Sequence, residues 1–283
     1  MPQHNLRIIY ENLIDDPSTS LSASSTQGGT SVNNLKNETK SSVWRATGNS
    51  ATLTINFSGA KTIGGIALPY SSMSSTSTIN VSAYSGASGG GSLIYSTGTI
   101  FACPVSMHTS SEASANDYAY GTSRTARAWF NQNYSGISSL VIVLSNTTTL
   151  EVGKLVVGAY WTAVCNTKFG LGTEFGDTST VTRLDSGDTI VRSGFRYRKM
   201  SFEMAWLLKQ DRPELRRILQ RNGVKYPMFV SLFPQVAQHG TASTDEEYDL
   251  EHTHCIYGRL TQISQLVNST YTVHANSVEI EEV

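Results

Sequence analysis

The stretch Ala51-Thr52-Leu53-Thr54-Ile55-Asn56-Phe57 decides the fold class of the first half of this chain. Its apolar residues Leu53, Ile55 and Phe57 alternate strictly with polar residues. Successive side chains of a strand point to opposite faces of a sheet, so a period of two predicts a strand with one buried face. The stretch therefore predicts a half-buried β-strand.

Other short strands are expected on both sides of this one. A turn at residues 58–61 leads to a second strand, which Pro69 closes. Short strands joined by Gly- and Ser-rich turns are typical of an antiparallel sandwich or jelly roll, and the pattern predicts no helix among them. The further predicted strands are residues 62–68, 77–84, 93–100, 140–144 and 150–160.

Residues 101–136 interrupt this rhythm. A connection of this length inside a compact domain usually carries function, and binding loops gather at the ends of sandwiches. Aromatic side chains among small polar residues suit both sugar faces and protein partners. We therefore expect an insertion that leaves one end of the sandwich, with four candidate ligand-binding residues: Tyr118, Tyr120, Trp129 and Tyr134.

The composition changes near residue 160. Residues 1–160 hold 15 of the Asp, Glu, Lys and Arg residues, whereas residues 161–283 hold 28. The sequence therefore predicts two domains, 1–160 and 161–283, each long enough for its own core.

The second half has one well-marked helix, residues 211–222. Asp211 is the expected N-cap, Pro213 lies in the first turn, and Gly223 follows the last turn as a left-handed stop. The stripe of Leu215, Ile218 and Leu219 is expected to be buried.

Strands are expected on both sides of this helix. The longest, residues 193–208, changes phase between Tyr197 and Met200, which predicts a bulge at Arg198-Lys199. After the change of phase, one face is shared by Met200, Phe202, Met204 and Trp206. The other strands are residues 226–233, 254–266 and 270–283. The predicted fold class is mainly β: an N-terminal jelly roll and a C-terminal β-sandwich with one packed helix.

The first half resembles discoidin-like, galactose-binding-type jelly rolls. The resemblance lies in residues 42–45, 51–57 and 63–69, and in a closing strand, residues 150–158, similar to the "IGRLFLG" ending of copies carried by bacteriophage tail proteins. The family's usual Asp in an "IDLG" strand is Asn56 here.

The second half resembles, in the order of its elements, the building block of siphophage tail-tube and distal-tail proteins. This resemblance implies a virion protein of a phage tail, made in the cytoplasm of the bacterial host. It also implies partners: copies of this chain in a ring, and the tail tube and hub. The outward arginines Arg216, Arg217 and Arg221 could meet an acidic loop of a neighbour, Asp245, Glu246 and Glu247.

Several function classes are excluded or disfavoured by composition. A net charge of −1 gives no basic field for nucleic acid, and no stretch approaches the roughly 20 apolar residues of a membrane span. The first residues do not resemble a signal peptide, so export by the standard route is not expected. The three cysteines are expected to be reduced and mostly buried.

Two short clusters suggest metal binding, but simpler interpretations are favoured. Residues 252–255 (His-Thr-His-Cys) offer two ligands at most, and zinc needs three protein groups, so an exposed strand start is the better interpretation. Residues 185–188 (Asp-Ser-Gly-Asp) are expected to form a hairpin turn and not a calcium loop. No metal site and no cofactor are predicted.

Three functions follow as hypotheses. The leading one is a non-enzymatic structural protein of a phage tail tip or baseplate, which assembles as a ring and could contact host glycans. The alternative is a non-catalytic carbohydrate-binding module or adhesin. A glycan-cleaving enzyme would need two carboxylates facing each other across a cleft, and the acids of the first domain show no such pairing in sequence.

Overall fold

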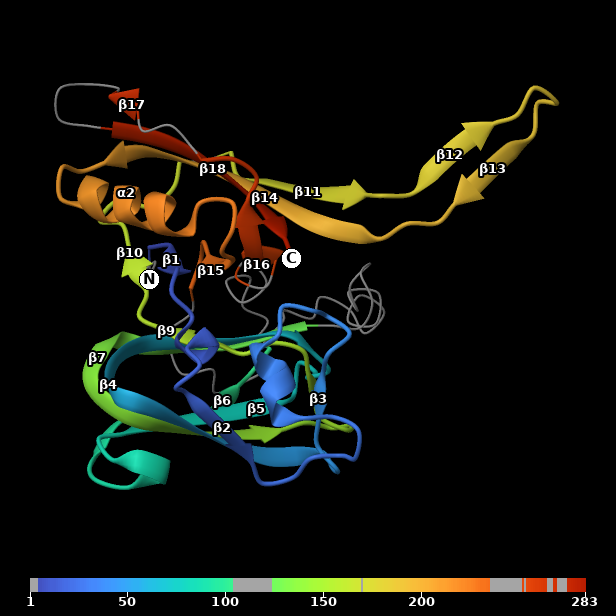
Figure 1. Cartoon of the computed structure of the whole chain (residues 1–283). Helices are drawn as coiled ribbons and strands as arrows, with labels where there is room; N and C mark the ends of the chain where they lie inside the picture. Colours follow the sequence, from blue (N-terminus) through green and yellow to red (C-terminus); the bar gives the residue numbers. More distant parts are fainter. Residues whose placement is uncertain are drawn as a thin grey trace.

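The computed structural model describes residues 5–103, 124–168, 170–234, 251, 253–263, 267–268 and 274–283. Over these residues the chain forms two eight-stranded antiparallel sheets and a two-stranded hairpin (Figure 1). One α-helix packs against the second sheet. The predicted fold class, mainly β with a single packed helix, is confirmed. Within the described residues, none of the helices has the length and apolar character needed to cross a bilayer.

The first sheet folds into a sandwich, here called the first sandwich. Its central strands are ordered β3-β8-β4-β7-β5-β6, with β2 and β9 also paired to β4. Three 3-10 turns lie between them, η1 (Leu13–Asp15), η2 (Val32–Lys36) and η3 (Ala87–Gly89). The strands are β2 (Ser20–Ala23), β3 (Trp44–Arg45), β4 (Ser50–Ser71), β5 (Thr78–Tyr84), β6 (Leu93–Phe101), β7 (Arg124–Ser145), β8 (Glu151–Val152) and β9 (Val156–Gly158).

Two long strands, β4 and β7, run through the whole first sandwich and bend together (Figure 1). Leu53, Ile55 and Phe57 are buried, as their alternation predicts. The predicted turn at residues 58–61 is wrong. The pairing register shifts between Asn56 and Ile63, so the backbone bends there but remains strand.

The predicted insertion 101–136 is also partly wrong. Its second part, from Arg124 onward, belongs to β7, which pairs with β4 and β5. Residues 104–123, which include Tyr118 and Tyr120, lie outside the described residues.

The second sheet has the strand order β10-β1-β15-β16-β18-β14-β11, with β17 paired to β18. Its first strand comes from the N-terminus: β1 pairs with β10 on one side and β15 on the other. Residues 7–9, which the prediction assigns to the first domain, therefore belong to the second sheet and not to the first sandwich. The strands are β1 (Arg7–Ile9), β10 (Trp161–Thr162), β11 (Gly172–Asp177), β14 (Arg196–Leu207), β15 (Met228–Ser231), β16 (Cys255–Leu260), β17 (Val267–Asn268) and β18 (His274–Glu282).

Helix α2 (Asp211–Asn222) has the predicted bounds and buries the predicted stripe of Leu215, Ile218 and Leu219. Gly223 ends it with a φ of +49° and donates its N–H to the Leu219 carbonyl, as expected of a glycine stop. The predicted cap is wrong. Asp211 is the first helical residue, and its carboxylate accepts the N–H of Val164 at 3.2 Å.

Strand β14 has its irregularity in a different place from the one predicted. The register against β11 and β18 is regular through Arg198 and Lys199, and it shifts between Met204 and Leu207. A bulge at that point reverses the phase of the strand, so Leu207 is buried and Trp206 is exposed. The predicted bulge at Arg198-Lys199 is therefore wrong, and Trp206 does not share the buried face of Met204.

A hairpin extends from the second sheet away from the body of the protein (Figure 1). We call residues 172–199 the arm: β11 and the start of β14 form its base, and β12 (Thr180–Arg183) and β13 (Thr189–Arg192) form its tip. Gly187, at a φ of +89°, sits in the tip turn, so residues 185–188 form the predicted hairpin turn. Every residue of β12 and β13 is exposed. The arm carries six exposed apolar side chains: Phe175, Val181, Leu184, Ile190, Val191 and Phe195.

The two bodies meet at a buried junction. One apolar cluster there takes residues from strands of both sheets, among them Trp129 of the first and Ile9 and Phe229 of the second. At its centre Glu251 accepts a hydrogen bond from Trp129 Nε1 at 2.7 Å and lies 2.9 Å from Arg127 Nε. Both side chains of this ion pair are fully buried. The first sandwich and the second sheet are therefore joined by packing and by a buried charge pair.

Burial and charge act in opposite directions on Arg127. Burial is the largest single effect and lowers the pKa of its guanidinium, but the Glu251 carboxylate, together with smaller effects of Cys255 and Cys103, raises the pKa overall. The ion pair with Glu251 therefore favours the charged form of Arg127.

Candidate binding pocket between the two sandwiches

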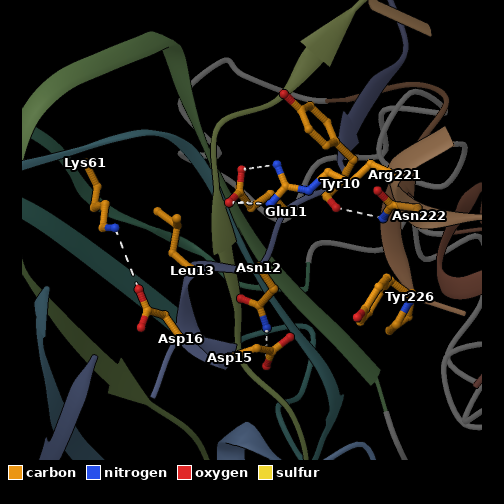
Figure 2. A pocket seen from close by; sticks show the side chains of 11 residues that line it. Tyr10, Glu11, Asn12, Leu13, Asp15, Asp16, Lys61, Arg221, Asn222 and Tyr226 are labelled. Atoms are coloured by element: carbon orange, nitrogen blue, oxygen red, sulfur yellow. Dashed lines mark hydrogen bonds and ion pairs between the residues drawn. The ribbon is translucent and has the colours of Figure 1, made fainter. Parts of the chain in front are cut away.

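A pocket of about 440 Å³ lies where the N-terminal segment passes from the second sheet to the first sandwich (Figure 2). One wall comes from residues 10–16 and Lys61, and the other from the end of α2 and the residues after it. The lining residues are Tyr10, Glu11, Asn12, Leu13, Asp15, Asp16, Lys61, Arg221, Asn222, Tyr226 and Pro227.

Asn12 fixes the first wall. Its Oδ1 accepts the N–H groups of Ile14 at 3.3 Å and Val157 at 2.9 Å. Its Nδ2 donates to the carbonyl of Leu155 and to Asp15 Oδ1, both at 3.0 Å. The side chain thus caps η1 and ties it to β9, which gives this wall a fixed shape.

The end of α2 fixes the second wall. Asn222 donates to the Tyr10 carbonyl at 2.7 Å, and Arg217 donates to the Tyr10 hydroxyl at 2.7 Å. Arg221 forms a two-pronged ion pair with Glu11, with N–O distances of 2.6 and 2.8 Å. The helix therefore holds the N-terminal segment, which it can do because β1 lies in the second sheet.

These contacts bear on the predicted assembly interface. Arg217 and Arg221 contact Tyr10 and Glu11 of their own chain, and their pairing with an acidic loop of a neighbour stays a prediction. Arg216 is exposed. Asp245, Glu246 and Glu247 lie outside the described residues.

Every charged side chain that lines the pocket has an oppositely charged partner. Glu11 pairs with Arg221. Asp15 lies 2.7 Å from the buried Lys154, and Asp16 lies 3.7 Å from Lys61. The pocket therefore presents polar atoms without an unpaired charge.

The two neighbouring aspartates differ in pKa. Burial raises the pKa of the Asp15 carboxyl, against the opposing effect of Lys154. Hydrogen bonds from Ser18, helped by Lys61, lower the pKa of Asp16. Among the described residues, no group of three or more His, Cys, Asp and Glu side chains could hold a metal ion.

Two tyrosines give the pocket its aromatic surface. Tyr226 is 52% exposed and Tyr10 is half-buried, and both lie along the pocket (Figure 2). An aromatic face beside fixed hydrogen-bonding groups is an arrangement that holds a neutral polar ligand with apolar patches.

The sequence-predicted ligand residues lie elsewhere. The placement of Trp129 on a surface loop is wrong: it is 3% exposed, on β7, in the junction. Tyr134 is half-buried, stacks on Tyr95 with ring centroids 4.7 Å apart, and donates its hydroxyl to Asn131 at 2.8 Å. It is accessible but outside the pocket.

Sequence reasoning missed Tyr10, Asn12 and Tyr226. They come from two regions more than 200 positions apart, and no local pattern marks them. The signal that was available was the "Asn-Leu-Ile-Asp" turn at residues 12–15, which is typical of a side chain that caps the backbone.

The chain was compared with known proteins. No protein-family model and no curated protein matches it. Three solved structures similar to part of it are two carbohydrate-binding modules and a glycoside hydrolase. The family 32 carbohydrate-binding module of Clostridium perfringens NanJ, in complex with galactose, is 12% identical over 53% of this chain and 98% of its own, with a TM-score of 0.36.

The second module is chitosan-binding module 1 of a chitosanase/glucanase from Paenibacillus sp. IK-5. It is 11% identical over 52% of this chain and 98% of its own, with a TM-score of 0.35. The third structure, a Ruminococcus gnavus GH29 fucosidase in complex with fucose, is 11% identical over 54% of this chain, with a TM-score of 0.37. This match spans only 27% of the fucosidase chain.

Proposed function

We propose that this protein is a non-catalytic carbohydrate-binding protein whose ligand occupies the pocket between the first sandwich and the second sheet. The observation that carries the proposal is the pocket itself: tyrosine rings beside polar groups whose charges are all internally paired.

Charge pairing bears on the class of ligand. An ionic ligand would have to break Glu11–Arg221 or Asp15–Lys154 to find a partner, and would leave a charge unpaired. A neutral sugar needs no such exchange. Its hydroxyl groups bond to amide and carboxylate groups, and its C–H faces pack on Tyr10 and Tyr226. A volume of about 440 Å³ suits roughly one or two sugar units.

Glycan-array binding of the full chain, followed by calorimetry on the best glycan, tests this function. Tyr226→Ala is expected to abolish binding while the free energy of unfolding stays near that of the wild type, because this ring is half exposed. Tyr134→Ala is the matched variant, since it removes an accessible tyrosine outside the pocket. Loss of binding in Tyr134→Ala alone would move the site to the Tyr95–Tyr134 pair. Binding to no glycan would overturn the function.

A second candidate is a structural virion protein of a phage tail tip or baseplate, similar to distal-tail or minor tail proteins, that assembles as a ring. It is favoured by the arm, because six exposed apolar side chains on one projecting hairpin are typical of a surface that is buried in an assembly. Its partners would be copies of itself and the tail tube and hub, and its place would be the virion.

Negative-stain imaging of the purified full chain tests the second candidate. Rings are expected, and light scattering at high concentration should report a mass that is a multiple of the monomer. A monodisperse monomer that binds no other tail component would overturn it.

A further inference from the structure

The tip of the arm has one face that is mostly apolar. Val181 lies opposite Val191 in the β12–β13 pairing, so the two side chains share a face. They are 68% and 60% exposed. Arg183 follows two residues after Val181 and therefore lies on the same face. We call these three residues the tip face.

The tip face has a charge without a partner. Arg183 forms no ion pair with any residue in the described part of the chain, whereas Arg196, at the base of the arm, pairs with Asp177 at 3.3 Å. A two-stranded hairpin with both faces in water is marginally stable. The tip therefore gains stability if a partner covers it.

A groove of about 860 Å³ lies at the base of the arm, bounded by the arm, by loops of the first sandwich and by the C-terminal end of β18. Phe195 in its lining is 85% exposed, and the apolar and aromatic lining residues are Val43, Tyr70, Phe195, Tyr197 and Val283. The Tyr70 hydroxyl donates to the Val283 carbonyl at 2.7 Å and so ties β4 to the C-terminal residue.

The groove also has a charge without a partner. Two of its acids are used: Glu151 pairs with Arg45 at 2.8 Å, and Glu282 lies 3.7 Å from both Lys40 and Arg198. Glu281 forms no ion pair among the residues that the structure describes, although it lines the same groove. The groove thus offers apolar surface and a carboxylate, Glu281, that makes no ion pair with the described residues although Lys199 and Arg259 are its cross-strand neighbours. Both features complement the tip face.

The tip of the same chain cannot fill this groove. Thr178 and Phe195, which join base to tip, are themselves part of its wall. They are held together by hydrogen bonds of 3.0 and 2.7 Å, and the tip strands project away from the body of the protein (Figure 1). A second molecule has to supply the tip.

We propose that the tip face of one copy of this protein lies in the groove of a second copy, with Val181 and Val191 against Tyr70 and Phe195 and with Arg183 paired to Glu281. Donor and acceptor surfaces differ, so the contact is head-to-tail and repeats from copy to copy until it closes into a ring or extends as a filament. The inference rests on the assembly function, the second candidate above, and is independent of carbohydrate binding.

Sedimentation velocity of the full chain over a concentration series tests the contact. Val181→Ser/Val191→Ser is expected to weaken association by on the order of 100-fold, because two exposed valines lose their burial. Arg183→Glu and Glu281→Arg are each expected to weaken it by about tenfold or more, since each places like charges together. Val143→Ser, a change at an exposed strand valine of the first sandwich, should leave association unchanged.

A mixing experiment gives the sharpest result. In an equimolar mixture of Arg183→Glu and Glu281→Arg chains, every mixed contact pairs opposite charges, so association should return although each variant alone is weak. Failure of the mixture to recover overturns the contact, and so does a wild type that remains monomeric. If rings form in the wild type and in all the arm variants alike, assembly stands and this contact is wrong.

Discussion

The junction and the arm use similar residues in opposite ways. In the junction the indole of Trp129 is covered by both bodies, and the charges of Arg127 and Glu251 face each other out of water. On the arm the ring of Phe195 is 85% exposed and Arg183 has no ion-pair partner in the described part of the chain. The junction is complete within one chain, whereas the arm has the features of an interface that still needs its other half.

The largest effect is expected at the junction. Replacing Glu251 by Ala leaves the guanidinium of Arg127 charged and buried without its carboxylate, which should lower the free energy of unfolding by about 3–5 kcal/mol. Urea denaturation measures this loss. Glu151→Ala is the matched control, because its pair with Arg45 is about one-third exposed and should contribute at most about 1 kcal/mol. Equal losses in the two variants would show that the buried Arg127–Glu251 pair contributes no more to stability than the partly exposed Arg45–Glu151 pair.

The sequence predicted the parts of the molecule in which pattern and environment agree. The alternation around Leu53, Ile55 and Phe57 gave a strand, and the stripe of α2 with Gly223 gave a helix with correct bounds. The prediction that Trp206 shares the face of Met204 was wrong because a bulge reverses the phase of β14 between Met204 and Leu207. The position of that bulge cannot be read from the hydrophobic periodicity.

The candidate pocket could not be predicted in the same way. It forms because β1, a strand of only three residues, inserts into the second sheet and draws Tyr10 toward Asn222. Three residues are too few to show a period. Contacts between distant segments of this kind are set by the packing of the whole chain, so neither the pocket nor the buried position of Trp129 has a local signal.

A smaller effect is expected from Trp129→Phe. This change keeps a ring in the junction but removes the N–H that donates to Glu251 at 2.7 Å, so thermal or urea unfolding should show a loss of about 1–3 kcal/mol. Phe195→Ser removes a whole phenyl ring from the arm and should change the stability of the monomer by less than about 0.5 kcal/mol, because this ring is exposed. A Phe195→Ser loss as large as that of Trp129→Phe would mean that the arm packs on its own chain.

The smallest effect concerns the neck of the arm, residues 177–179 and 195–196, where the base of the arm joins its tip. Asp177 accepts the N–H of Ser179 at 2.7 Å and a hydrogen bond from Arg196 at 3.3 Å. Hydrogen bonding to the Ser179 side chain, then to the Ser179 N–H and to Arg196, holds the pKa of Asp177 below its ordinary value. A lowered pKa means that the stabilisation is present above the ordinary Asp pKa and is lost as pH falls through the lowered one.

Acidification through that range should therefore loosen the neck while the junction stays intact. The amide resonance of Ser179 in NMR spectra should move with pH, and Asp177→Asn should abolish the movement. Since Asp177 is exposed, the effect on global unfolding should be slight. Asp16, whose carboxylate accepts both the N–H and the hydroxyl of Ser18, is the internal comparison, because the same turn there lies on the body of the protein. The body and the arm are expected to respond to pH independently of each other. If titration of Asp16, followed at Ser18, also loosened the arm, that expectation would be contradicted.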